Sequence, residues 1–132
     1  MQLGADRAVD TNGDWDKELS NETIDLVIES VGEATWQRSL NQLKKGGTMV
    51  VFGASAGDEV NFNLREFFYG QYSLLGTTLG SIEEFHEMIA FIDKHEIRPV
   101  IDSVYPLSET NAALEKIKKG RQFGKIAIKI AE

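Results

Sequence analysis

The 132-residue sequence contains no cysteine, only two prolines, and no apolar run near the ~18 residues that a membrane-spanning helix needs. The absence of cysteine excludes disulfides and thiolate-bound zinc. Basic residues are in the minority, with 14 lysines and arginines against 21 acidic residues, and the net charge of −7 argues against a nucleic-acid-binding surface. The N-terminus has no signal-peptide layout. We therefore expect a globular domain with no nucleic-acid or membrane partner, and the cytoplasm as its default location.

Two further absences concern binding sites. His86 and His95 lie nine residues apart on one expected helix, so they do not share a face well and do not predict a metal pair. No two of the twelve glycines are separated by a single residue, so the phosphate-binding motif G-x-G-x-x-G cannot occur, and there is no G-K-[ST] either. Taken alone, the sequence has no glycine-rich turn to hold a phosphate.

Segments of strand and helix character alternate along the chain, which is typical of an α/β domain with a parallel sheet. A helix end closed by Gly4 is expected first, and the clearest later helix begins with a capping box of Ser81 and Glu84. The last helix is expected to be capped by Ser108 and to stop at Gly120. The expected strands are 7–10, 24–31, 48–52, 72–77, 100–105 and 124–130, and the expected helices are 35–45, 64–70, 82–95 and the one after Ser108.

One stretch, KKGGTMVVFGASAG, has the pattern of a buried strand that ends at a ligand. Four apolar residues, 49–52, follow a Gly-Gly turn and stop at Gly53-Ala54-Ser55. Because ligands of open α/β sheets bind outside the carboxyl ends of the strands, this end is a candidate site. No catalytic group accompanies it. Asp25 and Glu29 have no identifiable partner for acid–base work, and Ser55, outside any G-x-S-x-G motif, is expected to make a turn hydrogen bond.

Six motifs in order resemble the C-terminal part of a medium-chain dehydrogenase/reductase. They are LGADRAVD, IDLVIESVG, LNQLKKGGTMVVFGAS, NFNLREFFYGQYSLLGTTLGS, EEFHEMIAFIDKHEIRPVIDSVYPLSETNAALEKIKKG and GKIAIKI. The family includes zinc-containing alcohol dehydrogenases and zinc-independent quinone oxidoreductases, and the resemblance covers essentially all 132 residues.

The resemblance implies a particular fold and division of the chain. The fold is a partial Rossmann-like, doubly wound parallel sheet that lacks its first two strands and the glycine-rich turn. Segment 7–10 would be strand 3 of that sheet and 24–31 strand 4. Residues 1–102 would be the C-terminal portion of the nucleotide-binding domain. Residues 103–132 would be a terminal helix and strand that normally pack on a catalytic domain, which is missing from this chain.

The resemblance also implies which residues contact a cofactor. The cofactor would be NAD or NADP in the full-length parent, where zinc is possible, although this chain carries no zinc ligand and no catalytic residue. The corresponding positions are the strand-4 end (Ser30, Val31, Gly32), the strand-5 end (Gly53, Ala54, Ser55), the carboxamide segment (Thr77, Thr78, Leu79, Gly80), and Gly124 and Lys125 near the cofactor phosphate. The alternative for each is backbone geometry, with glycine for tight turns and threonine for strand propensity.

Two strand edges predict association. Without the first two strands of the sheet, segment 24–31 has an open apolar edge, which we expect to be covered by segment 7–10 or by another chain. Segment 72–77 is an edge strand in dimeric members of the family, and its Leu74 and Leu75 favour pairing. A homodimer through 72–77 or through the 24–31 edge is therefore expected.

Three functional interpretations follow, in decreasing order of support. The first is a fragment of an NAD(P)-dependent oxidoreductase that transfers hydride between nicotinamide and an alcohol, carbonyl or quinone, the isolated chain being inactive. The second is a stand-alone dimerising interaction module that binds no nucleotide. The third is another α/β enzyme such as a methyltransferase, whose strand-4 end also reads D-x-V. The SETNAALEKIKKG and GKIAIKI segments argue against this last interpretation.

Overall fold

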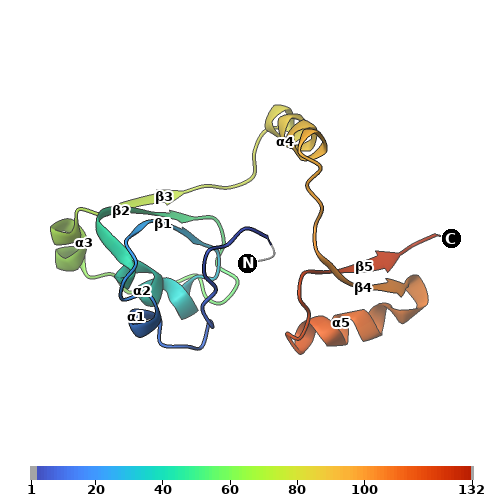
Figure 1. Cartoon of the computed structure of the whole chain (residues 1–132), viewed down its shortest axis with the longest axis horizontal. Helices are drawn as coiled ribbons and strands as arrows, with labels where there is room; N and C mark the ends of the chain where they lie inside the picture. Colours follow the sequence, from blue (N-terminus) through green and yellow to red (C-terminus); the bar gives the residue numbers. More distant parts are fainter. Residues whose placement is uncertain (1–2, 132) are drawn as a thin grey trace. The chain divides into compact units, whose positions relative to one another are not determined.

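A computed structural model describes residues 3–131 of the chain (Figure 1). The chain divides into two compact units, Met1–Leu79 and Gly80–Glu132. Helix α4 (Ile82–Lys94) falls in the second unit. The division expected after residue 102, with residues 103–132 packing on a further domain, stays a prediction. The helix end expected before Gly4 falls partly on residues 1 and 2, outside the described residues.

The first unit contains a three-stranded parallel sheet in the order β1-β2-β3 (Figure 1). Its strands are β1 (Ile24–Glu29), β2 (Leu43–Val51) and β3 (Ser73–Gly76). The register places Glu29 opposite Val51, and Val51 opposite Gly76. All three carboxyl ends therefore lie at the same edge of the sheet, where a Rossmann-like fold binds its ligand. The predicted α/β class with parallel strands is confirmed.

The core of this unit lies between the sheet and its helices. Met49 on β2 is completely buried, and Trp36, Leu40 and Leu43 pack around it. A helix over 35–45, as the sequence predicts, would place these three residues on one face. The helix α2 (Glu33–Asn41) is nevertheless shorter than the predicted 35–45, because Leu43 already belongs to β2.

Helix α3 (Leu64–Gly70) has the predicted bounds, and Asn63 caps it by accepting hydrogen bonds from the Arg65 and Glu66 N–H groups. A row of aromatic rings joins α3 to the core, with centroids separated by 6.3 Å from Trp36 to Phe62 and by 4.8 Å from Phe62 to Phe67. The helices thus gather on the Met49 side of the sheet. On the other side Leu26, Ile28 and Leu75 are each more than half exposed, at 52%, 58% and 54%.

The segment before β1 differs most from expectation. Residues 7–10 form no strand, so segment 7–10 does not cover the edge of β1, and that part of the prediction is wrong. The Asp10 carbonyl instead accepts hydrogen bonds from Gly13 N–H at 2.9 Å and from the Trp15 indole at 2.9 Å. A short helix that sequence reasoning missed, α1 (Trp15–Glu18), follows, capped by Asp14. The Asp10 carbonyl is therefore engaged in this turn and not in a sheet. Coverage of the β1 edge by another chain stays a prediction.

The second unit pairs β4 (Ile101–Pro106) with β5 (Lys125–Lys129) in parallel. The predicted capping box of Ser81 and Glu84 at the start of α4 is confirmed. Ser108 does not cap the last helix, because it lies in a 3-10 turn, η1 (Leu107–Glu109), before α5 (Thr110–Lys118). Within residues 3–131, no helix is long and apolar enough to cross a membrane.

Candidate functional site

The ends of β1 and β2 are joined by hydrogen bonds at or next to the predicted site residues. The Ala56 N–H donates to the Val31 carbonyl at 2.7 Å, and the Ser55 hydroxyl donates to the Ser30 carbonyl at 3.4 Å. The second bond is a long contact to the end of another strand and not the turn hydrogen bond expected for Ser55. A Cβ atom on Gly53 would lie 2.8 Å from the same Ser30 oxygen, so only glycine fits there without a shift. The structure therefore brings the turn 30–32 and the turn 53–55 together.

Gly32 makes the closest backbone approach of this edge. Its φ of 93° is rarely adopted by other residues, and a Cβ at this position would lie 2.3 Å from the Gly57 carbonyl oxygen. That carbonyl accepts a hydrogen bond from the Glu33 N–H, the first residue of α2, at 3.1 Å. The start of α2 is therefore capped by the chain itself. It does not present this donor to a phosphate.

Glu29, which the sequence left without a partner, is the buried carboxylate of this edge, with only 3% of its surface exposed. It accepts hydrogen bonds from the Val31 N–H at 2.7 Å and the Gly32 N–H at 3.2 Å. Two hydroxyls of α2 also donate to it, Thr35 at 2.9 Å and Ser39 at 2.6 Å. Burial opposes its ionisation, but these hydrogen bonds outweigh burial and hold the pKa of Glu29 below its ordinary value of 4.5.

The third strand end is more open. The Thr77 N–H continues the sheet ladder by donating to the Val51 carbonyl at 3.0 Å. Thr78 and Leu79 follow it and are exposed, Leu79 at 93%. Backbone pairing thus brings Thr77 to the same edge as the other two turns. The structure gives Thr78 and Leu79 no such fixed place.

Lys125 belongs to the second unit, where it begins β5. Its N–H donates to the Val100 carbonyl at 2.8 Å, and Gly124 before it has a φ of 101°. Asp102 holds the preceding loop by accepting the Phe123 N–H at 3.0 Å. An ion pair with Lys116, together with that N–H and the Ser103 hydroxyl, lowers the pKa of Asp102 to about 2. The Lys125 loop is therefore fixed by contacts within its own unit.

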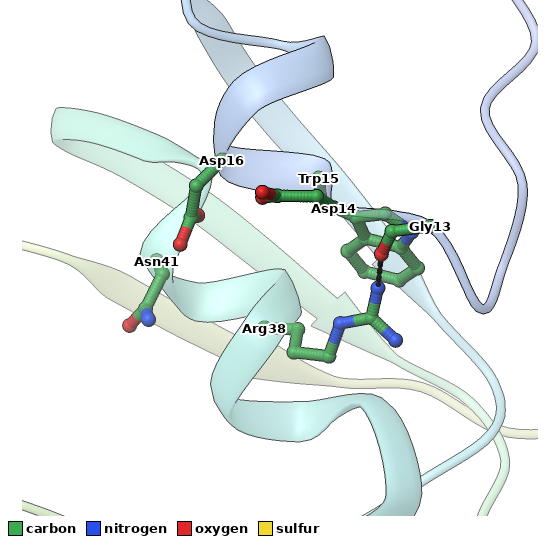
Figure 2. Close-up of a pocket in the computed structure, with 6 residues that line it drawn as sticks. All are labelled: Gly13, Asp14, Trp15, Asp16, Arg38 and Asn41. Atoms are coloured by element: carbon green, nitrogen blue, oxygen red, sulfur yellow. Dashed lines mark hydrogen bonds between the residues drawn. The ribbon is translucent and has the colours of Figure 1, made fainter.

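A cavity of about 180 Å³ lies elsewhere, between α1 and α2, and none of the predicted site residues lines it (Figure 2). The Arg38 guanidinium lies 4.0 Å from the centroid of the Trp15 ring, and it donates to the Gly13 carbonyl at 2.6 Å. Arg38 also donates to the Thr11 carbonyl at 2.7 Å. These contacts fasten the N-terminal segment to α2, a structural role. Asp14, a helix-capping residue directly before Trp15, was the sequence signal that could have revealed α1.

Residues 3–131 do not supply a zinc site. No group of three histidine, aspartate or glutamate side chains lies close enough together in this part of the chain to hold a metal ion. A structural zinc is bound by four protein ligands and a catalytic zinc by three. We therefore derive no step through zinc from this chain.

Comparisons with known proteins agree with this architecture. Residues 3–128 match the family described as zinc-binding dehydrogenase. The zinc-type alcohol dehydrogenase-like protein YogA of Leptosphaeria maculans is 32% identical to 98% of the chain, which covers 39% of that protein. The mitochondrial NAD(P)H oxidoreductase RTN4IP1 of Danio rerio is 27% identical, with the same coverages of 98% and 39%.

Solved structures carry the same fold. An NAD-dependent alcohol dehydrogenase superposes with a TM-score of 0.82 at 27% identity, over 98% of this chain and 39% of that one. The alcohol dehydrogenase of Aeropyrum pernix gives a TM-score of 0.81 at 26% identity, over 95% of this chain and 37% of that one. The chain has a parallel sheet with three aligned strand ends, and nearly its whole length superposes on these dehydrogenases. This combination defines a Rossmann-like portion of a dehydrogenase. The chain belongs to the zinc-binding dehydrogenase family and spans about 39% of the length of the curated relatives named above.

Proposed function

We propose that this chain is part of an NAD(P)-dependent oxidoreductase and that its three strand ends form one side of the nicotinamide cofactor crevice. The observation that carries the proposal is the contact between the turns 30–32 and 53–55, with Thr77 on the same sheet edge. The names of the relatives, alcohol dehydrogenase and NAD(P)H oxidoreductase, support it. When bound, such a cofactor supplies hydride transfer, here to or from an alcohol, carbonyl or quinone.

The chain on its own is expected to be inactive. The Gly57 carbonyl occupies the Glu33 N–H at the start of α2, and the sequence has no glycine-rich turn to hold a phosphate. Glu29, the buried carboxylate beside the turns, is saturated with hydrogen bonds from the protein itself and is not free to act as an acid or base. The residues of these strand ends therefore bind and orient one side of a cofactor. The catalysis would depend on segments that the longer relatives have.

The proposal predicts weak, localised cofactor contact. Adding NADH or NADPH at millimolar concentration to the ¹⁵N-labelled chain should shift the amide signals of Ser30–Gly32, Gly53–Ser55 and Thr77. The shifts should not saturate below ~1 mM, an affinity of about −4 kcal/mol, because the phosphates lack their cradle. Free nicotinamide and AMP, added separately, show which half of the cofactor is responsible. Shifts confined to other parts of the chain would refute the proposal.

We further propose that copies of this chain pair through a sheet edge. Both outer strands of the first unit have a free edge within the described chain and exposed leucines, Leu75 on β3 at 54% and Leu26 on β1 at 52%. Charged residues on an edge strand oppose such pairing. If β3 carries the contact, Leu75→Lys should convert a dimer to a monomer in light scattering, and the matched variant Leu26→Lys should not. The opposite result assigns the contact to β1, and a monomeric unmodified chain rejects it.

The two other functional interpretations, an interaction module and a methyltransferase, are not supported. A stand-alone dimerising module without nucleotide binding finds no support among relatives that are named as oxidoreductases. Family membership removes the methyltransferase alternative.

A further inference from the structure

We propose that Glu29 is a positioning residue whose buried carboxylate holds the turn Ser30–Gly32 in the shape that lines the candidate cofactor crevice. The inference rests on the proposed function for the role of that turn, but the hold itself stands on the contacts of Glu29. Sequence reasoning gave this glutamate no role.

The first argument is the number of donors that converge on one side chain. Four groups donate to Glu29, namely two backbone amides of the turn and two hydroxyls of α2. An ionised carboxylate has about four lone-pair sites on two oxygens, so the four donors saturate it, whereas an amide has only one accepting oxygen. The site therefore selects a glutamate over a glutamine of the same size.

The second argument is that the turn has no other support for these amides. Val31 and Gly32 lie outside every strand and helix, and within residues 3–131 their N–H groups have no hydrogen-bond partner except Glu29. These two hydrogen bonds, at 2.7 and 3.2 Å, fold the chain back toward Glu29 at the second and third residues after the end of β1. Hydrogen bonds to a charged group contribute more than neutral ones. The carboxylate thus ends the strand and sets the turn.

The third argument is the absence of a countercharge. No salt bridge joins Glu29 to a cation in the described part of the chain, although only 3% of its surface is exposed. Neutral donors from the turn and from α2, which follows it directly in the chain, replace water around the charge. Because these segments are the turn and α2, the charge couples the position of the turn to the helix that packs on the core. The turn is therefore placed relative to the turn 53–55 with which it is in contact.

The test compares amide hydrogen exchange, residue by residue, in the full 132-residue chain and two variants. Glu29→Gln removes the charge and one accepting oxygen with almost no change in volume. Exchange at Val31 and Gly32 should then quicken about tenfold relative to Met49 in the core, the effect of weakening a hydrogen bond to a charged group. The matched variant Ser39→Ala removes a donor on the α2 side only. Any increase in exchange rate in this variant should not be concentrated at Val31 and Gly32.

Each outcome decides something different. Exchange in Glu29→Gln that quickens equally at Val31 and Met49 overturns the proposal, because Glu29 then contributes only general stability. If that variant does not fold, the unmodified chain still decides. Its Val31 and Gly32 amides must exchange as slowly as strand amides, although they lie outside any strand, and fast exchange overturns the proposal.

NADH-induced shifts at the turns that weaken in Glu29→Gln but not in Ser39→Ala support the positioning role. Their absence in the unmodified chain counts against the proposed function alone.

Discussion

Replacing Met49 by alanine is expected to destabilise the first unit by about 2–5 kcal/mol, the range for removing a large side chain from a core. Met49 is the one large side chain that is completely buried in the described chain, and Trp36, Leu40 and Leu43 pack around it. A free energy of unfolding of 5–15 kcal/mol is typical of a whole domain, so this loss is a large part of the total. Urea unfolding followed by Trp36 fluorescence measures it.

The control for this prediction is Met49→Leu. Leucine has a similar volume, so the cost should stay below about 1.5 kcal/mol. Because the chain has two compact units, the transition should be assigned with amide signals from each unit. Equal losses of stability in the alanine and leucine variants would show that the volume filled by the side chain of residue 49 is not what stabilises the unit.

Replacing Gly32 by alanine is expected to cost about 3 kcal/mol or more, through two effects that add. The backbone at φ 93° is unfavourable for alanine, and the new Cβ would lie 2.3 Å from the Gly57 carbonyl oxygen. Relief requires the loop that contains Gly57 to move away from the start of α2. We therefore expect both a lower unfolding midpoint and large amide shifts at Ala56 and Gly57 in NMR spectra.

Gly46 provides the matched control for Gly32. Its φ of 77° is also in the region that favours glycine, but a Cβ there would have no atom within 4 Å. Gly46→Ala should therefore cost only the backbone term, about 1 kcal/mol. If the two variants lose equal stability, the close approach between Gly32 and the Gly57 carbonyl is not a constraint on the fold.

Much of the fold could be predicted because it depends on neighbours in the sequence. The capping box of Ser81 and Glu84 and the bounds of α3 follow from residues three or four apart. The strand β1 and the core positions Trp36 and Leu40 follow from apolar spacing. Such signals are complete within one turn or one strand, so no knowledge of the remaining chain is needed.

Two of the errors occurred where a segment depends on a distant partner. A strand at 7–10 requires a neighbouring strand to accept its hydrogen bonds, and in this chain the Asp10 carbonyl is taken by Gly13 and Trp15 instead. Helix 35–45 was predicted too long because Leu43 suits both a helix face and a buried strand, and pairing with Ile24 decides for the strand. Local propensity does not contain this choice.

The candidate site also has one part that the sequence predicted and another that only the structure revealed. Gly53–Ser55 was found from the sequence alone, because an apolar run that ends at small residues is visible in one segment. What only the tertiary structure decided is that this turn touches Ser30–Gly32, and that Glu29 gathers donors from the turn and from α2. The physical reason is that the contact between the turns joins Ser55 to Ser30, 25 residues apart, and so depends on the pairing of β1 with β2. Glu29 meets its donors only because the turn and α2 fold back over its carboxylate. Its neighbours in the sequence, Ile28 and Ser30, give no sign of that environment.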